Sequence, residues 1–91
     1  MQIEFDSDKE RQNVRKHGLS LSLGASVLAD PNVLEVLDLR FDYGEERIIA
    51  YGMTSGAVCV CAFTMRGNTA RIISVRKAEE REIRRYFEEP R

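Results

Sequence analysis

Basic side chains gather in the last third of the chain, where they could bind phosphate. The stretch from Arg66 to Arg85 holds seven cations and three anions. It is typical of a strand over residues 69–76, followed by a helix from about Lys77. A guanidinium offers a planar fork of donors that matches phosphate oxygens. Such a strand and helix could hold an RNA backbone and stabilise the charge of a pentacoordinate phosphorus. The alternative is solvated arginines paired with Glu45 or Glu46.

Strand alternation assigns these side chains to the two faces of a sheet. It predicts that Arg71 lies on one face with Val75, and that Ser74 and Arg76 lie on the other. Arg66 ends the preceding strand-like run, so Arg66 and Arg76 could each reach over a rim of the sheet.

His17 is the one histidine of the chain, and its side chain could transfer protons near neutral pH. Cleavage of RNA through its 2′-hydroxyl needs a base for that hydroxyl and an acid for the 5′-oxygen. His17 beside Lys16 could perform one of these tasks while an arginine or lysine performs the other. The alternative is structural, because cations suit the last turn of a helix.

The sequence contains few candidate metal ligands in a suitable pattern. A single histidine leaves no zinc ligand set. Cys59 and Cys61 point to the same face of one strand but sit too far apart along the extended chain to form a disulfide, so both are predicted to be buried thiols. Four acids are close in sequence: Asp38, Asp42, Glu45 and Glu46. No acid-x-lysine motif follows them, so a metal-dependent DNA nuclease is the third-ranked hypothesis. We expect no metal and no cofactor.

The composition is that of a globular domain. Among 91 residues, 43% are hydrophobic and 32% charged, which predicts one domain over residues 1–91 with a modest core. No apolar run approaches a membrane span, and the acidic N-terminus does not resemble a targeting peptide, so we expect a cytoplasmic protein. Residues 1–46 hold ten acids and five bases, whereas residues 47–91 hold five acids and nine bases. The second half could therefore attract a polyanion although the net charge is −1.

Three segments are expected to be helical. A polar helix over residues 8–17 would begin at a capping box, Ser7 to Glu10, and end at a left-handed Gly18. A short helix capped by Ser20 would end before residues 30–32. Its expected apolar stripe is Leu21, Ala25 and Leu28. The last helix would bury Ile83, Tyr86 and Phe87.

The remaining segments favour strands. They are residues 3–5, 34–39, 47–53, 57–66 and 69–76, with hairpin turns at 54–56 and 67–68. We therefore expect an α+β fold, in which an antiparallel meander packs one face against the N-terminal helices and a C-terminal helix closes the chain.

Several segments resemble the BrnT family in order and spacing. They are Ile3-Glu4-Phe5-Asp6, Asn13 with Lys16-His17-Gly18, Asp30-Pro31, Asp42-Tyr43-Gly44-Glu45-Glu46-Arg47, Thr64-Met65-Arg66 and Arg71-Ile72-Ile73-Ser74-Val75-Arg76-Lys77-Ala78. The resemblance covers nearly the whole chain, and its most specific feature is the early KHG combined with the late RIIS-x-RKA. The family consists of toxins of type II toxin–antitoxin pairs.

This resemblance implies a RelE-like fold and a ribonuclease, independent of the ribosome or loosely linked to it, that inhibits translation. It also implies a BrnA-like antitoxin that neutralises the toxin, dimerises through a ribbon-helix-helix module and represses the shared operon. DNA would be contacted only through that antitoxin, and no membrane would be involved.

The resemblance also suggests roles for individual residues. The motif positions are Lys16, His17, Glu45, Arg47, Arg66, Arg71, Ser74 and Arg76. Lys16 or His17 would transfer protons, and Arg66 and Arg76 would bind and stabilise phosphate. The predicted RNA-binding residues are Arg71, Ser74, Lys77 and Arg47, with Arg71 open to the antitoxin as well.

The alternative function is a toxin-like scaffold that has lost activity and acts as a co-repressor. The two functions share a fold, so the fold cannot separate them. Convergence of the four predicted catalytic residues on one phosphate would favour the enzyme.

Overall fold

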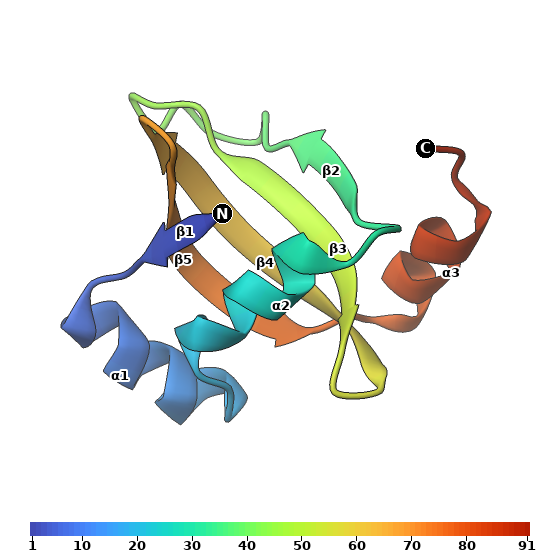
Figure 1. The fold of residues 1–91 in the computed structure, drawn as a ribbon, viewed down its shortest axis with the longest axis horizontal. Helices are drawn as coiled ribbons and strands as arrows, with labels where there is room; N and C mark the ends of the chain where they lie inside the picture. The colour runs from blue at the N-terminus through green and yellow to red at the C-terminus, as the bar shows by residue number, and fades with distance from the viewer.

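The computed structural model describes residues 1–91, which form five strands and three α-helices. The elements are β1 (Gln2–Glu4), α1 (Ser7–His17), the 3₁₀ turn η1 (Leu21–Leu23), α2 (Gly24–Ala29), β2 (Leu34–Leu37), β3 (Ile48–Thr54), β4 (Ala57–Arg66), β5 (Thr69–Lys77) and α3 (Glu80–Glu88). One sheet has the order β1-β5-β4-β3-β2 (Figure 1). The α+β class and the antiparallel meander from β2 to β5 are confirmed. The sheet as a whole is mixed, because β1 pairs parallel to β5.

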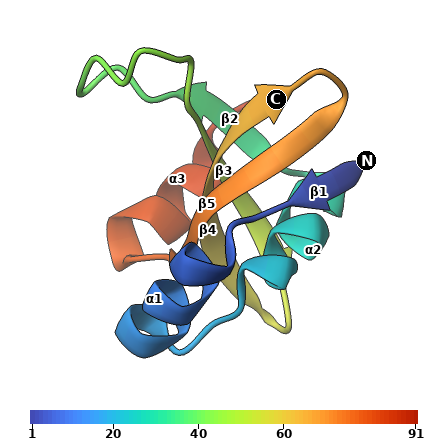
Figure 2. The same cartoon turned by 90° about the vertical axis from the view of Figure 1, so that its left-hand side faces the viewer.

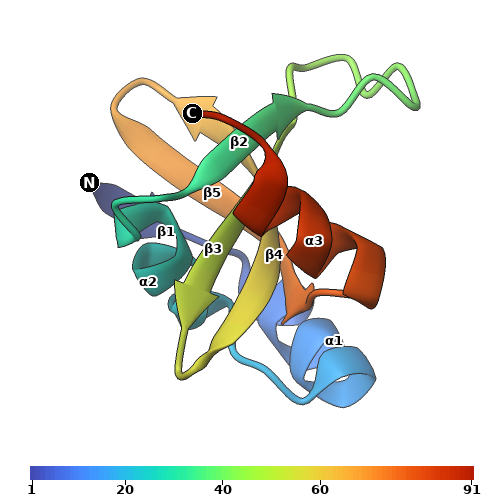
Figure 3. The same ribbon diagram turned by 90° about the vertical axis from the view of Figure 1, so that its right-hand side faces the viewer.

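The sheet has an apolar core on each face, which corrects the prediction that helices cover one face only. Val27 of α2 packs with Ala50, Cys61 and Phe63 on one side. Tyr86 of α3 packs on the other side, with strand residues that alternate with the first set: Leu34, Tyr51, Val58 and Val60. Figures 2 and 3 show α2 and α3 on opposite sides of the sheet. No helix is long and apolar enough to cross a membrane.

A β-bulge in β5 overturns the predicted alternation. Ala62 pairs with Ser74 and the next residue of β4, Phe63, pairs with Ile72, so Ile73 is the extra residue. Arg71, Ser74 and Arg76 then pair with alternate residues of β4: Thr64, Ala62 and Val60. Cross-strand partners share a face, so all three side chains lie on the α3 side, whereas Ile72 and Val75 are buried in the opposite core.

The first helix begins and ends close to the prediction, although its cap differs. Asp6, rather than Ser7, is the N-cap, because its side chain accepts a hydrogen bond from the Lys9 amide. Glu10 instead accepts from Ser20 Oγ and from the Leu21 amide, and so ties α1 to η1. Gly18 ends α1 with φ of 72°, the left-handed conformation expected of it.

Asn13 binds α1 to the edge of β5 at Val75, past the residues of β5 that pair with β1. Its side chain is buried and donates to the carbonyls of Leu19 and Val75, both at 2.8 Å. Its Oδ1 accepts from the Val75 amide at 3.2 Å. The amide of Asn13 thereby satisfies two backbone groups that a neighbouring strand would otherwise bind.

We predict that Asn13→Ala destabilises the protein by about 2–3 kcal/mol, because it leaves buried backbone groups of Val75 and Leu19 without partners. Urea denaturation followed by circular dichroism measures the change. Gln12→Ala is the matched control, since Gln12 is the exposed neighbour on the same helix. Equal unfolding midpoints for the two variants would contradict this role of Asn13.

The predicted apolar stripes of the two shorter helices are partly wrong. Leu21 and Val27 are fully buried, whereas Ala25 is exposed. On α3 only Tyr86 is buried among the three predicted residues; Ile83 is 37% and Phe87 66% exposed. α3 also begins at Glu80 rather than near Lys77, because Lys77 still pairs with Cys59 in the sheet.

Two smaller predictions also have clear outcomes. Cys59 and Cys61 are buried free thiols, as expected, and burial raises the pKa of Cys61 to about 12. The strand predicted over residues 34–39 ends at Leu37, so Leu39 belongs to the following loop.

Candidate active site

Two hollows meet at Ser74. The larger, of about 350 Å³, is a groove on the α3 side of the sheet. Its floor is formed by β3, β4 and β5, and its walls are α3 and the segment 36–40. The smaller, of about 140 Å³, lies between α1 and β5. It is lined by Lys9, Gln12, Asn13, Lys16, His17, Ile73 and Ser74. Ser74 lines both, so the two hollows are adjacent.

Lys16 and His17 enter the smaller hollow from the last turn of α1. The hydrogen bonds of Asn13 hold this turn against β5, next to the bulge at Ile73. The pKa of His17 is lowered from its ordinary value by partial burial and by the positive charges of Lys16 and Arg76. His17 is therefore mainly neutral at pH 7, the form that can accept a proton.

Arg76 faces the groove from β5 and forms a bidentate ion pair with Glu82 of α3. Both oxygens of Glu82 accept from the guanidinium at 2.8 Å. The side chains of Arg76 and Glu82 are 33% and 12% exposed. The pair lowers the pKa of Glu82 and raises that of Arg76. Arg76 therefore does have an acidic partner, but it is Glu82, not Glu45 or Glu46 as the structural alternative supposed.

Arg66 and Arg71 lie further along the same face. Arg66 pairs with Thr69 at the far end of β4, six residues beyond Val60, the partner of Arg76. At about 3.3 Å per residue this separates Arg66 from Arg76 by roughly 20 Å. Arg71 lies between them and donates to Glu4 of β1 at 2.8 Å. The structure thus brings together Lys16, His17, Ser74 and Arg76, and it leaves Arg66 outside this cluster.

Arg47 and Lys77 are also outside the cluster. Arg47 stacks over the ring of Tyr43 at 3.9 Å, and its Nε, 3.6 Å from Glu45, has no hydrogen-bond partner. Lys77 is exposed at the end of β5. The acids of the neighbouring loop form no cluster of three potential metal ligands.

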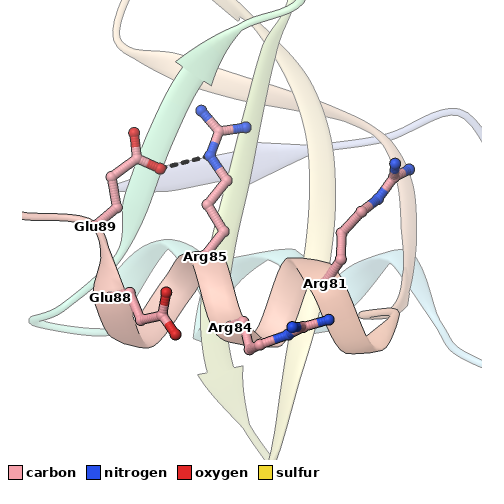
Figure 4. Close-up of a pocket in the computed structure, with 5 residues that line it drawn as sticks. All are labelled: Arg81, Arg84, Arg85, Glu88 and Glu89. Atoms are coloured by element: carbon pink, nitrogen blue, oxygen red, sulfur yellow. Dashed lines mark hydrogen bonds and ion pairs between the residues drawn. The ribbon is translucent and has the colours of Figure 1, made fainter.

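The outer surface of α3 is rich in arginine (Figure 4). Arg85 donates to Glu89, whereas Arg81 and Arg84 form no ion pair. Arg81 and Arg85 also line the groove. The wall of the groove next to Arg76 is therefore cationic, which favours an anionic ligand.

Some residues of the site were not singled out by sequence reasoning. Lys9 and Gln12 share the helix face of Lys16, and their spacing to it could have revealed them. Glu82 lay in the predicted helix, but its pairing with Arg76 depends on how α3 folds back over the sheet.

Comparison with known proteins assigns this architecture to a class. Residues 5–82 match the family model described as the ribonuclease toxin, BrnT, of type II toxin–antitoxin systems. The chain is therefore of the ribonuclease toxin class, whose members have a protein antitoxin as partner and RNA as target. It belongs to the BrnT family, as its motifs predicted. No curated protein sequence matches the chain.

Proposed function

We propose that this toxin is an endoribonuclease that cleaves RNA without a metal ion, by attack of a 2′-hydroxyl on the adjacent phosphate. One observation carries the proposal. His17, whose lowered pKa favours its neutral form, lies with Lys16, Ser74 and Arg76 where the two hollows adjoin. The scissile phosphate would lie at this junction, beside Ser74.

Each step of the reaction has a group to perform it. Neutral His17 accepts the proton of the 2′-hydroxyl, and the 2′-oxygen forms a bond to phosphorus. The bond from phosphorus to the 5′-oxygen breaks, and the Lys16 ammonium gives that oxygen a proton. The products are a 2′,3′-cyclic phosphate and a free 5′-hydroxyl.

Arg76 stabilises the charge that develops on the phosphorus oxygens. A guanidinium has five N–H donors, and three hydrogen bonds engage Arg76: two with Glu82 and one with the Lys77 carbonyl. Two donors remain for phosphate while Glu82 keeps the side chain in place.

The RNA would run from this junction along β4 and β5. Arg71 and Arg66 lie on the same face at increasing distance and would bind phosphates away from the scissile one. Arg81 and Arg84 of α3 would bind on the other side of Arg76. Lys77 would add a weaker contact at the margin, and Arg66 would bind RNA rather than act in catalysis. Arg47, which pairs with Glu45 and stacks on Tyr43, would not contact the RNA.

We predict that cleavage depends on pH through His17. Because the pKa of His17 is lowered from its ordinary value of about 6.5, the basic form dominates at neutral pH. The rate should therefore be flat near pH 7 and fall about tenfold per pH unit once pH drops below that pKa. Measuring kcat/KM for a fluorogenic RNA from pH 4.5 to 8 tests this. A rate that keeps rising from pH 6.5 to 8 would contradict a neutral histidine base.

The resemblance extends the proposal to the biology of the toxin. The fold would be RelE-like, one domain over residues 1–91, and the toxin would act in the cytoplasm by inhibiting translation. Its antitoxin would be BrnA-like and would carry the contacts to DNA.

A second function, that of a toxin without activity, is favoured by one observation. Arg66 lies roughly 20 Å from Arg76, so the four predicted catalytic residues do not all converge on one phosphate. That toxin would act as a co-repressor in the antitoxin–DNA complex. Analysis of reaction products separates the two. A 2′,3′-cyclic phosphate and a 5′-hydroxyl on RNA treated with the purified toxin are expected from the ribonuclease. Intact RNA, both free and ribosome-bound, would favour the co-repressor.

A further inference from the structure

A row of exposed apolar side chains continues from β2, which pairs with β3 alone and leaves its other edge open. Leu37 is 51%, Leu39 83% and Phe41 67% exposed. All three line one hollow beside the open edge of β2, and an exposed apolar surface of this kind is one on which another chain can dock. We call these three residues the β2-edge patch.

The segment that carries the β2-edge patch is held in one arrangement. Asp38 accepts two hydrogen bonds from the Arg40 side chain and one from the Tyr43 hydroxyl, which keep the pKa of Asp38 well below its usual range. The Asp38 amide donates to the Arg47 carbonyl, and the Arg47 guanidinium stacks on Tyr43. Binding to such a preformed surface has a small ordering cost.

The charges around the β2-edge patch select the kind of partner. Both cations of the segment 38–47 are paired, Arg40 with Asp38 and Arg47 with Glu45. Asp42 and Glu46 form no ion pair, which leaves the rim acidic. An acidic rim repels RNA, and it also repels the same surface of a second copy.

We propose that the β2-edge patch is the docking surface for the protein antitoxin. An extended segment of the antitoxin lies along the open edge of β2, with apolar side chains on the patch and basic side chains near Asp42 and Glu46. Leu37 and Leu39 also line one wall of the groove on the α3 side. An antitoxin bound here covers the mouth of that groove and keeps RNA out. The proposed docking depends only on the β2-edge patch and the charges around it. The account of inhibition rests on the proposed function as well.

Two phenylalanines make a matched pair of test variants. Phe41 is in the patch, and Phe87, 66% exposed on α3, is outside it. The antitoxin is recovered from the co-expressed complex, and its binding to each toxin variant is measured by calorimetry. Phe41→Ser should raise the Kd by about 30- to 100-fold, as loss of a hot-spot aromatic does. Phe87→Ser should change it less than threefold. An unchanged Kd for Phe41→Ser would overturn the proposal.

RNA cleavage by each free variant is measured in parallel, so a failure of the proposed ribonuclease cannot be mistaken for a failure of docking. Hydrogen exchange identifies the occupant directly. Amides of residues 34–41 should become protected when the antitoxin binds. Protection of these amides in the toxin alone, rising with its concentration, would indicate a second copy. Protection by a 2′-deoxy oligonucleotide would indicate nucleic acid, and either result would overturn the proposal.

Discussion

His17→Ala is expected to reduce RNA cleavage by about 10²- to 10⁴-fold, the usual contribution of a general base. The imidazole lies in the hollow between α1 and β5, where burial and the charges of Lys16 and Arg76 favour its neutral form. No other side chain of the hollow has an ordinary pKa near neutrality. A water molecule in the place of the imidazole would be a far weaker base.

Stability separates this catalytic effect from a structural one. The His17 side chain makes no hydrogen bond within the protein, so His17→Ala should unfold at nearly the same urea concentration as the wild type. Arg15→Ala is the control for the loss of a side chain in the same helical turn, because Arg15 is exposed and outside the hollow. If the single-turnover rate of His17→Ala stayed within threefold of that of Arg15→Ala, His17 would not be the base.

Arg76→Ala should have the second large effect, on two properties at once. Cleavage should fall by about 10²- to 10³-fold, because the phosphorus oxygens lose their guanidinium. The free energy of unfolding should fall by about 1–3 kcal/mol, because the buried Glu82 carboxylate is left with no cation. Arg76→Lys should lie between alanine and wild type in cleavage, since an ammonium keeps the charge but not the planar fork.

The double variant Arg76→Ala/Glu82→Gln distinguishes the two losses. Removing the unpaired carboxylate should restore most of the stability, because the two side chains are directly coupled. It should restore none of the cleavage. Single-turnover kinetics and urea denaturation on the same preparations measure both. A double variant that cleaves RNA at the wild-type rate would show that Arg76 serves the fold alone.

Local features of this chain were predictable from its sequence. β4 has the predicted bounds, the Gly67-Asn68 turn leads directly into β5, and Gly18 ends α1. Each depends on a few neighbouring residues, whose propensities and turn chemistry act over short range.

The bulge at Ile73 could not be predicted in the same way. Ile72 and Ile73 are both apolar, so the pattern does not show which of them is the extra residue. Pairing with β4 decides this, and it moves Arg71 to the face of Ser74 and Arg76. Long-range contacts likewise decide that α3 covers the second face, where Tyr86 packs in the core and its hydroxyl donates to Asp30.

The candidate site was predicted in part for the same reason. Lys16 with His17, and Ser74 with Arg76, were visible as motifs, but their meeting depends on Asn13, which holds α1 against β5 across 62 positions of the chain. Arg66 looked equivalent to Arg76 in sequence, because both end a strand. The antiparallel pairing of β4 and β5 then separates the two ends.

The most direct test of metal-free cleavage through the 2′-hydroxyl uses two RNAs that differ in a single oxygen. The cut site of the purified toxin, freed of antitoxin, is mapped first, and the RNA is then remade with one 2′-deoxy residue on the 5′ side of the cut. Both RNAs are treated in EDTA. We predict that the unmodified RNA is cut at its full rate and that the modified RNA is not cut at that position. Equal cutting of both RNAs, or loss of all cutting in EDTA, would contradict this mechanism.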